Sequence, residues 1–306
     1  MEQPIIYKGM PRLSYADIKE ELIDAFNSPY FLWYEYLKLS KDYWWVCKLM
    51  GETQDAKLKA MYWDFRDVHE VEFRDWWLDR GRYLFAEQVQ LPKVSLVYKE
   101  SLNINPTPQN YVLLEIPLNL TERTISKQVL AIIRAQQNRA IKRVSHAKRP
   151  LAKLSGLRRD VMKKAHYIWR LNRLISLSKQ PNSTIGKPFN TVTSQQIGIT
   201  MGLAPSCLPK RFDTPEKERK KRNGMKVAVS RMLQRANALI ANAEIGIFPS
   251  FEEVAQRIRW TDEQQLELNA AVYRGEWQPE ANDEEFFRKV LNESKNTNSV
   301  DSKKTF

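Results

Sequence analysis

The stretch "RAQQNRAIKRVSHAKRPLAKLSGLRRDVMKKAHYIWRLNR", residues 134–173, is the most informative part of the sequence for fold and charge. It holds thirteen Lys and Arg residues and one acid, Asp160, so it carries nearly all of the net charge of +13. Apolar residues recur within and before it at helical spacing, which predicts two amphipathic helices, from about residue 121 to Pro150 and from about 151 to 177. The centre of the chain is therefore expected to be helical and strongly basic.

A helical projection of the second helix separates its apolar and basic residues. The apolar face holds Leu154, Leu157, Val161, Ala165, Ile168 and Ile175. The opposite face forms what we call the basic ridge, which consists of Arg159, Lys163, His166, Arg170 and Arg173. The preceding helix places Arg134 on its polar side, with Lys142 at the edge of that side. Both helices are thus expected to bury one stripe and to expose a basic one.

Unrelieved repulsion between like charges at helical spacing is destabilising, which favours a polyanionic partner for this surface. Nucleic acid is the expected partner, duplex DNA more than RNA, with Arg134, Lys142 and the basic ridge on phosphates. Three alternatives remain: an RNA-binding or ribonucleoprotein subunit, an assembly protein whose basic middle docks an acidic protein surface, and a merely solvated face. A membrane surface fits least, because the apolar face lacks Trp and Phe anchors.

A second basic run, residues 210–235, holds ten Lys and Arg residues and three acids, so the chain has a basic middle between acidic ends. Immediately before and into this run, "SQQIGITMGLAPSCLPKRF", residues 194–212, resembles a helix-turn-helix with Gly202 in the turn. Its expected base contacts are Ser206, Lys210 and Arg211. Pro209 argues against a helix-turn-helix, because a proline at this position would break the second helix.

The rest of the chain predicts a mainly α fold with a small antiparallel β element (α+β). Residues 1–92 form an aromatic-rich, acidic-sided helical domain, in which Ser28 and Pro29 start a helix that runs to Gly51. Residues 93–180 hold two strands, 93–98 and 111–116, and the two basic helices. Residues 181–292 form a helical region whose long helix is capped by Thr214 and ends at Gly246. Residues 293–306 are expected to be a disordered tail.

The aromatic clusters of the N-terminal domain, such as "YFLWYEY" and "DWWLDRGRYLF", have the spacing of a core between helices. Any exposed members would mark a contact with a second copy or with another protein. We therefore expect the N-terminal helices to carry any oligomer or protein interface.

Catalytic and metal motifs are missing from the sequence, so no enzyme, cofactor or metal site is predicted. His69, His146 and His166 share no metal spacing with each other or with the two cysteines, and His69 is expected on a helix surface. A nuclease using Glu100 and Glu115 stays an alternative without strong support. Two distant cysteines and no long apolar window indicate a reduced, cytoplasmic protein without a membrane span. A transcription regulator or an accessory factor for DNA transactions is the expected function.

Overall fold

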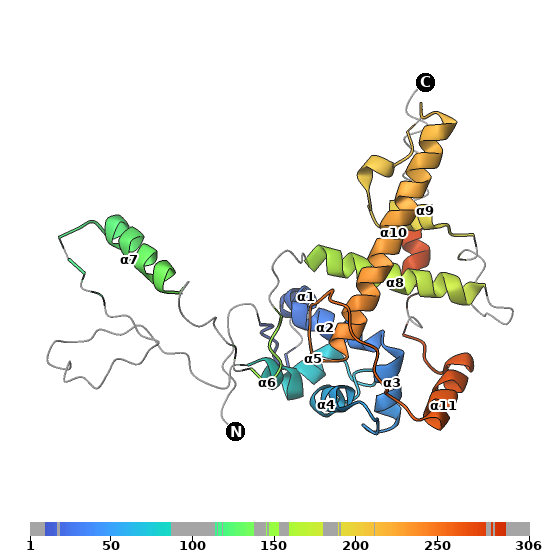
Figure 1. Cartoon of the computed structure of the whole chain (residues 1–306), viewed down its shortest axis with the longest axis horizontal. Helices are drawn as coiled ribbons and strands as arrows, with labels where there is room; N and C mark the ends of the chain where they lie inside the picture. Colours follow the sequence, from blue (N-terminus) through green and yellow to red (C-terminus); the bar gives the residue numbers. More distant parts are fainter. Residues whose placement is uncertain are drawn as a thin grey trace. The chain divides into compact units, whose positions relative to one another are not determined.

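The computed structural model of the chain (Figure 1) consists of two compact units. One unit is formed by Met1–Ile5 with Ala86–Pro150, the other by Ile6–Phe85 with Leu151–Phe306. The domain boundaries expected after residues 92, 180 and 292 stay a prediction. The structure describes residues 10–16, 19–86, 114, 116–117, 119–137, 145, 147–152, 159–179, 189, 191–210, 212–279, 283 and 285–291.

The described residues are mainly helical, which confirms the predicted helical class. The larger unit contains α1 (Lys19–Phe26), α2 (Pro29–Lys38), α3 (Lys41–Lys48), α4 (Ala56–Phe65), α5 (Phe73–Trp76), the π-helical turn η1 (Trp77–Gly81), α6 (Arg82–Phe85), α8 (Arg159–Ser178), α9 (Ser194–Thr200), the 3-10 turn η4 (Pro205–Cys207), α10 (Pro215–Ala243) and α11 (Asp262–Tyr273). The smaller unit contains α7 (Glu122–Gln137). None of the helices in the described ranges is both long and apolar enough to cross a membrane.

The predicted β element finds no support, since no strand occurs among the described residues. The expected strand 93–98 lies outside the described residues. Of the expected strand 111–116 only Leu114 and Ile116 are described, and neither belongs to a strand. The predicted tail, residues 293–306, also lies outside the described residues.

The predicted helix starts at Ser28 and Thr214 are confirmed. The Ser28 hydroxyl accepts a hydrogen bond from the Phe31 backbone N–H, and the Thr214 hydroxyl accepts one from Lys217. In both helices a proline occupies the first position, where no N–H is needed.

The helix expected to run from Ser28 to Gly51 is instead divided into α2 and α3 at Ser40. The Ser40 hydroxyl accepts a hydrogen bond from the Tyr43 N–H at 2.8 Å, so Ser40 caps a second helix. A serine side chain can compete with the helical backbone for such hydrogen bonds. Here the Ser40 side chain takes the hydrogen bond, so the first helix ends and a new helix begins. The break lets α3 change direction and pack on α4.

Aromatic side chains form the core between α2, α4 and the segment from α5 to α6, as the sequence predicts. Trp33 is fully buried, and its ring lies 5.4 Å from Phe65 and is stacked on Phe248 at 5.5 Å. Phe65 in turn stacks on Trp76 at 5.0 Å. Phe248 follows α10, so the N-terminal core is completed by a residue from far along the chain.

Residues 251–260, which we call the strap, have no helical structure and lie between α10 and α11. The backbone carbonyl of Arg259 accepts hydrogen bonds from the Thr53 hydroxyl at 2.7 Å and from the Gln54 N–H at 3.1 Å. The Trp260 indole N–H donates to Asp42 at 3.0 Å. The strap is thereby held against α3 and the start of α4.

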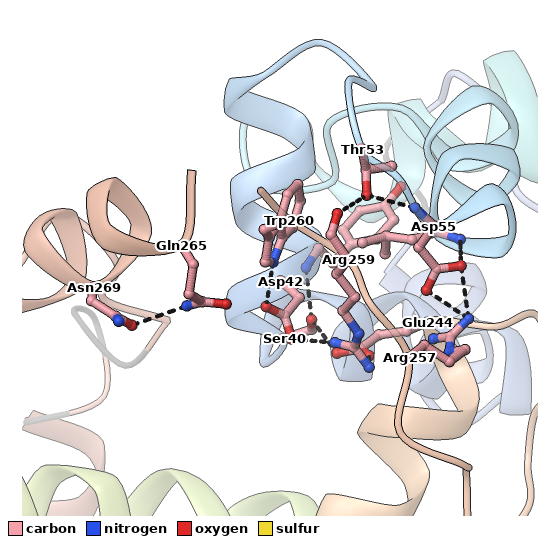
Figure 2. Close-up of polar contacts among 12 residues, drawn as sticks. Ser40, Asp42, Thr53, Asp55, Glu244, Arg257, Arg259, Trp260, Gln265 and Asn269 are labelled. Atoms are coloured by element: carbon pink, nitrogen blue, oxygen red, sulfur yellow. Dashed lines mark hydrogen bonds and ion pairs between the residues drawn. The ribbon is translucent and has the colours of Figure 1, made fainter. Parts of the chain in front are cut away.

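Charged side chains reinforce the strap (Figure 2). The Arg259 guanidinium lies between two acids, Asp42 on α3 and Glu244 at the end of α10, with 2.6 Å to the Glu244 carboxylate. Glu244 also accepts a hydrogen bond from the Ser40 hydroxyl at 2.5 Å. Burial raises the pKa of Glu244 to about 7, although Arg259 opposes this shift. Arg259 therefore compensates two carboxylates that have little access to water.

The contact between α9 and α10 depends on a residue without a side chain. A Cβ atom at Gly198 would lie 2.2 Å from the sulfur of Met225, a residue that is fully buried on α10. We expect Gly198→Leu to lower the free energy of unfolding by about 1–3 kcal/mol, because overpacking displaces buried neighbours. Urea denaturation checks this, with the exposed Asn223→Leu on α10 as a control that should change stability by less than about 0.5 kcal/mol. Equal losses in both variants would contradict the close-packing argument.

Candidate nucleic-acid interface

The helix that carries the predicted basic ridge, α8, is buried on several sides. It packs against α2 and α10, and its buried residues are Met162, Ala165, His166, Ile168, Leu171, Leu174, Ile175 and Ser178. At 100° per residue these positions spread around most of the helix, not along one stripe. Of the predicted apolar face, Val161 is half-buried, and Leu154 and Leu157 lie outside the described residues.

The predicted position of His166 on an exposed ridge is wrong. The imidazole is 5% exposed, packs edge-on against the Tyr36 ring at 5.3 Å and lies 3.8 Å from the Glu35 carboxylate. Burial, with Arg170 as a second cause, lowers the pKa of His166 to about 3. The imidazole is therefore neutral at physiological pH and does not face a ligand.

Two arginines of the ridge are engaged within the chain. Arg170 forms a two-point ion pair with Asp283, in which Nε and Nη2 each donate to one carboxylate oxygen. The Arg173 guanidinium lies 4.7 Å from the centre of the Trp277 ring, in the geometry of a cation–π contact. Both partners come from the segment after α11, so this segment covers part of the ridge.

The remaining ridge residues lie near the end of α1. The Lys163 ammonium donates a hydrogen bond to the Asn27 side chain, and Arg159 lies 3.5 Å from the Asn27 carbonyl. Arg159 remains exposed and Lys163 is half-buried. The repulsion expected among the cations of the basic ridge is thus relieved within the chain, by the Asp283 carboxylate, the Trp277 ring and the oxygen atoms of Asn27.

The smaller unit contains the other predicted backbone contacts. Arg134 is exposed on α7, which has no buried residue among those described. Lys142 lies outside the described residues. The structure therefore leaves Arg134 available for a ligand and gives no position for Lys142.

The helix-turn-helix predicted at residues 194–212 is not formed. The first helix, α9, is present, and Gly202 turns the chain with a φ of +60°. The second helix is replaced by the single 3-10 turn η4, after which Leu208 is extended. Leu208 precedes Pro209, and a residue before proline is forced away from helical geometry. Ser206 and Lys210 are exposed in the connection to α10, and Arg211 lies outside the described residues.

The helix that follows, α10, contains most of the second basic run and exposes a surface rich in basic and polar side chains. Its buried side carries Met225, Val229, Met232 and Ala236, which pack toward the rest of the larger unit. We call the exposed surface the outer face; it consists of Arg219, Arg222, Asn223, Lys226, Val227, Ser230, Arg231 and Gln234, with Arg222 and Arg231 at its two edges. No acid occurs between Arg219 and Ala243.

The cations of the outer face differ from those of α8 in their pairing. Within the part of the chain that the structure describes, Arg219, Arg222, Lys226 and Arg231 form no ion pair. Two neighbouring lysines are paired: Lys221 with Asp213 at 2.6 Å, and the solvent-exposed Lys220 with Glu216 at 2.8 Å. These unpaired cations spread over about half of the helix circumference and are available for an external anion.

No family model, curated protein or solved structure matches the chain. Figure 1 shows α10 crossing α8, with its C-terminal end beside α2. Gly198 of α9 lies against Met225 and Val229, near the middle of α10. The half of α10 that begins at Pro215 carries most of the outer face, and Ser206 and Lys210 precede it in the chain.

Proposed function

We propose that the chain binds nucleic acid, with duplex DNA as the expected ligand, through the outer face of α10. The protein then acts as a transcription regulator or as an accessory factor in DNA transactions, without catalysis of its own. The observation that supports this most is the acid-free outer face, on which four cations have no ion-pair partner among the described residues.

The shape of α10 suits this ligand. A helix of 29 residues is about 43 Å long, which exceeds one turn of duplex DNA. The major groove is about 12 Å wide and admits one α-helix. Because the buried side of α10 is anchored on α8 and α9, its outer face is presented by a rigid support.

The side chains of the outer face match the groups that a duplex exposes. Arginine and lysine pair with phosphates and with guanine, while amide and hydroxyl groups reach base edges. Asn223, Ser230 and Gln234 lie among the cations, so the face combines phosphate binding with groups able to discriminate bases. Ser206 and Lys210, the predicted base contacts that are described, would extend this surface at the start of α10.

Binding of the whole chain to a fluorescent duplex across a salt series tests the proposal. If the four unpaired cations contact phosphates, the logarithm of the binding constant should fall with the logarithm of salt concentration with a slope of about −4 or steeper. Competition by single-stranded RNA at equal salt separates the two nucleic acids, since the proposal requires duplex DNA to compete better. Absence of binding at low salt would overturn the proposal and would favour an acidic protein surface as the partner.

A further inference from the structure

Three side chains with metal-binding atoms meet in the N-terminal helices. The ligand atoms of Cys47, Asp67 and His69 all lie within 4.8 Å of one another. Cys47 belongs to the last turn of α3, while Asp67 and His69 belong to the turn that follows α4. The packing of α3 on α4 therefore brings together a thiol, a carboxylate and an imidazole.

The spacing of these atoms is close to that of a tetrahedral metal site. Zinc binds sulfur at about 2.3 Å and nitrogen or oxygen at about 2.0–2.2 Å, so its ligand atoms lie about 3.3–3.6 Å apart. A contraction of about 1 Å converts the observed cluster into this geometry.

The backbone that carries Asp67 and His69 is held firmly. Arg66 has a φ of +58°, a left-handed conformation that reverses the chain after α4. The Arg66 carbonyl accepts a hydrogen bond from Tyr43 at 2.8 Å, and the Val68 carbonyl accepts one from Tyr34 at 3.0 Å. Two buried tyrosines thus fix the turn on both sides of Asp67, as a preorganised site requires.

The Asp67 Oδ1 atom accepts a hydrogen bond from the His69 backbone N–H at 2.8 Å, and the other two donor groups have few contacts. The Nε2 atom of His69 is buried and has no hydrogen-bond partner among the described residues. The Cys47 thiol is 7% exposed, and its sulfur lies 3.8 Å from the Arg66 carbonyl, which is a weak hydrogen bond at most. Most buried polar atoms in proteins are paired, so the unpaired imidazole nitrogen needs an explanation.

We propose that Cys47, Asp67 and His69 bind a zinc ion. A thiolate combined with an imidazole and a carboxylate selects zinc over magnesium or calcium, which prefer oxygen ligands. Three protein ligands leave a fourth position for water. His69 also lines a cavity of about 390 Å³ together with Glu35, Lys38 and Trp44.

A divalent ion would displace the proton of the Cys47 thiol and would pair the resulting thiolate with a positive centre.

Cobalt(II) substitution provides the test, because cobalt bound to a thiolate gives a charge-transfer absorption band. The full-length chain is stripped with a chelator and titrated with cobalt(II) alone, and zinc is then added in competition. We expect one ion per chain, the thiolate band, and a higher melting temperature with zinc. Cys47→Ser should abolish the band, and His69→Gln should weaken binding at least about 100-fold. The matched control is Cys207→Ser, because Cys207 is the second free cysteine and has no part in the cluster.

Each outcome decides the proposal. Loss of the band in Cys47→Ser with retention in Cys207→Ser supports the site. Absence of the band in the parent chain overturns it, as does equal cobalt binding by the parent and His69→Gln. If Cys47→Ser fails to fold, as judged by circular dichroism, the comparison of His69→Gln with the parent decides. The test does not depend on nucleic-acid binding, so the two proposals stand or fall separately.

Discussion

Replacing Arg219, Arg222, Lys226 and Arg231 together with Gln is expected to weaken binding to duplex DNA by about a thousandfold at roughly 0.1 M salt. Each phosphate contact contributes about 0.9 to the slope of log K against log salt, so four contacts contribute about 3.6. The slope of the variant should flatten by the same amount. Fluorescence anisotropy over a salt series measures both quantities. All four side chains are exposed on α10, so the variant should keep its fold.

The matched control removes the same number of positive charges from another surface. Lys41, Lys48, Lys57 and Lys59 are exposed on α3 and α4, away from the outer face of α10. Their joint replacement by Gln lowers the net charge equally but should leave most of the affinity and the salt slope intact. If both variants lose affinity equally, binding reflects net charge and the outer face is not the interface.

Replacing Arg259 with Leu is expected to lower the free energy of unfolding by about 3–5 kcal/mol at pH 8. The change leaves Asp42 and the buried Glu244 close together without their common cation. Urea denaturation measures the loss. Arg274→Leu is the control, because Arg274 pairs with Glu276 at an exposed position, and its loss should stay below about 1 kcal/mol. Similar losses in the two variants would contradict the compensating role of Arg259.

The pH dependence of the same variant gives a second readout. The pKa of Glu244 is raised by burial from 4.5 to about 7 in the folded chain, so the folded state holds this proton more tightly than the unfolded state. The group therefore stabilises the fold below about pH 4.5, and this contribution is lost as pH rises toward 7. Without Arg259 the pKa should rise further, so the loss of stability should be smaller at pH 5 than at pH 8. Adding Glu244→Gln should restore part of it.

Local signals in the sequence predicted much of the fold. Ser28 with Pro29 and Thr214 with Pro215 mark helix starts because a hydroxyl and a proline act within one turn. The aromatic spacing predicted the core for a similar reason. Residues three or four positions apart lie on the same side of a helix and therefore pack against the same adjacent elements. The sequence does not predict the division at Ser40, because the residues around it are compatible both with one continuous helix and with two helices separated by a cap.

Errors arose where the partner of a residue lies far along the chain. His166 was placed on the outer surface because its helical neighbours are basic, but Tyr36 and Glu35 bury it. Arg170 looked free because Asp283 is more than a hundred positions away. The cluster of Cys47, Asp67 and His69 shows no metal-binding spacing, since nineteen residues separate the cysteine from the aspartate. Such pairings follow from tertiary packing, which helical periodicity does not encode.

The strap also has a consequence for how the protein is made. Asp42 and Trp260 are 218 positions apart in the chain, and Trp33 stacks on Phe248. Translation therefore releases α2 and α3 long before the residues that complete their packing. Until the ribosome has added Phe248 and the strap, the nascent chain holds an aromatic surface without its cover, which favours chaperone binding and association between nascent chains.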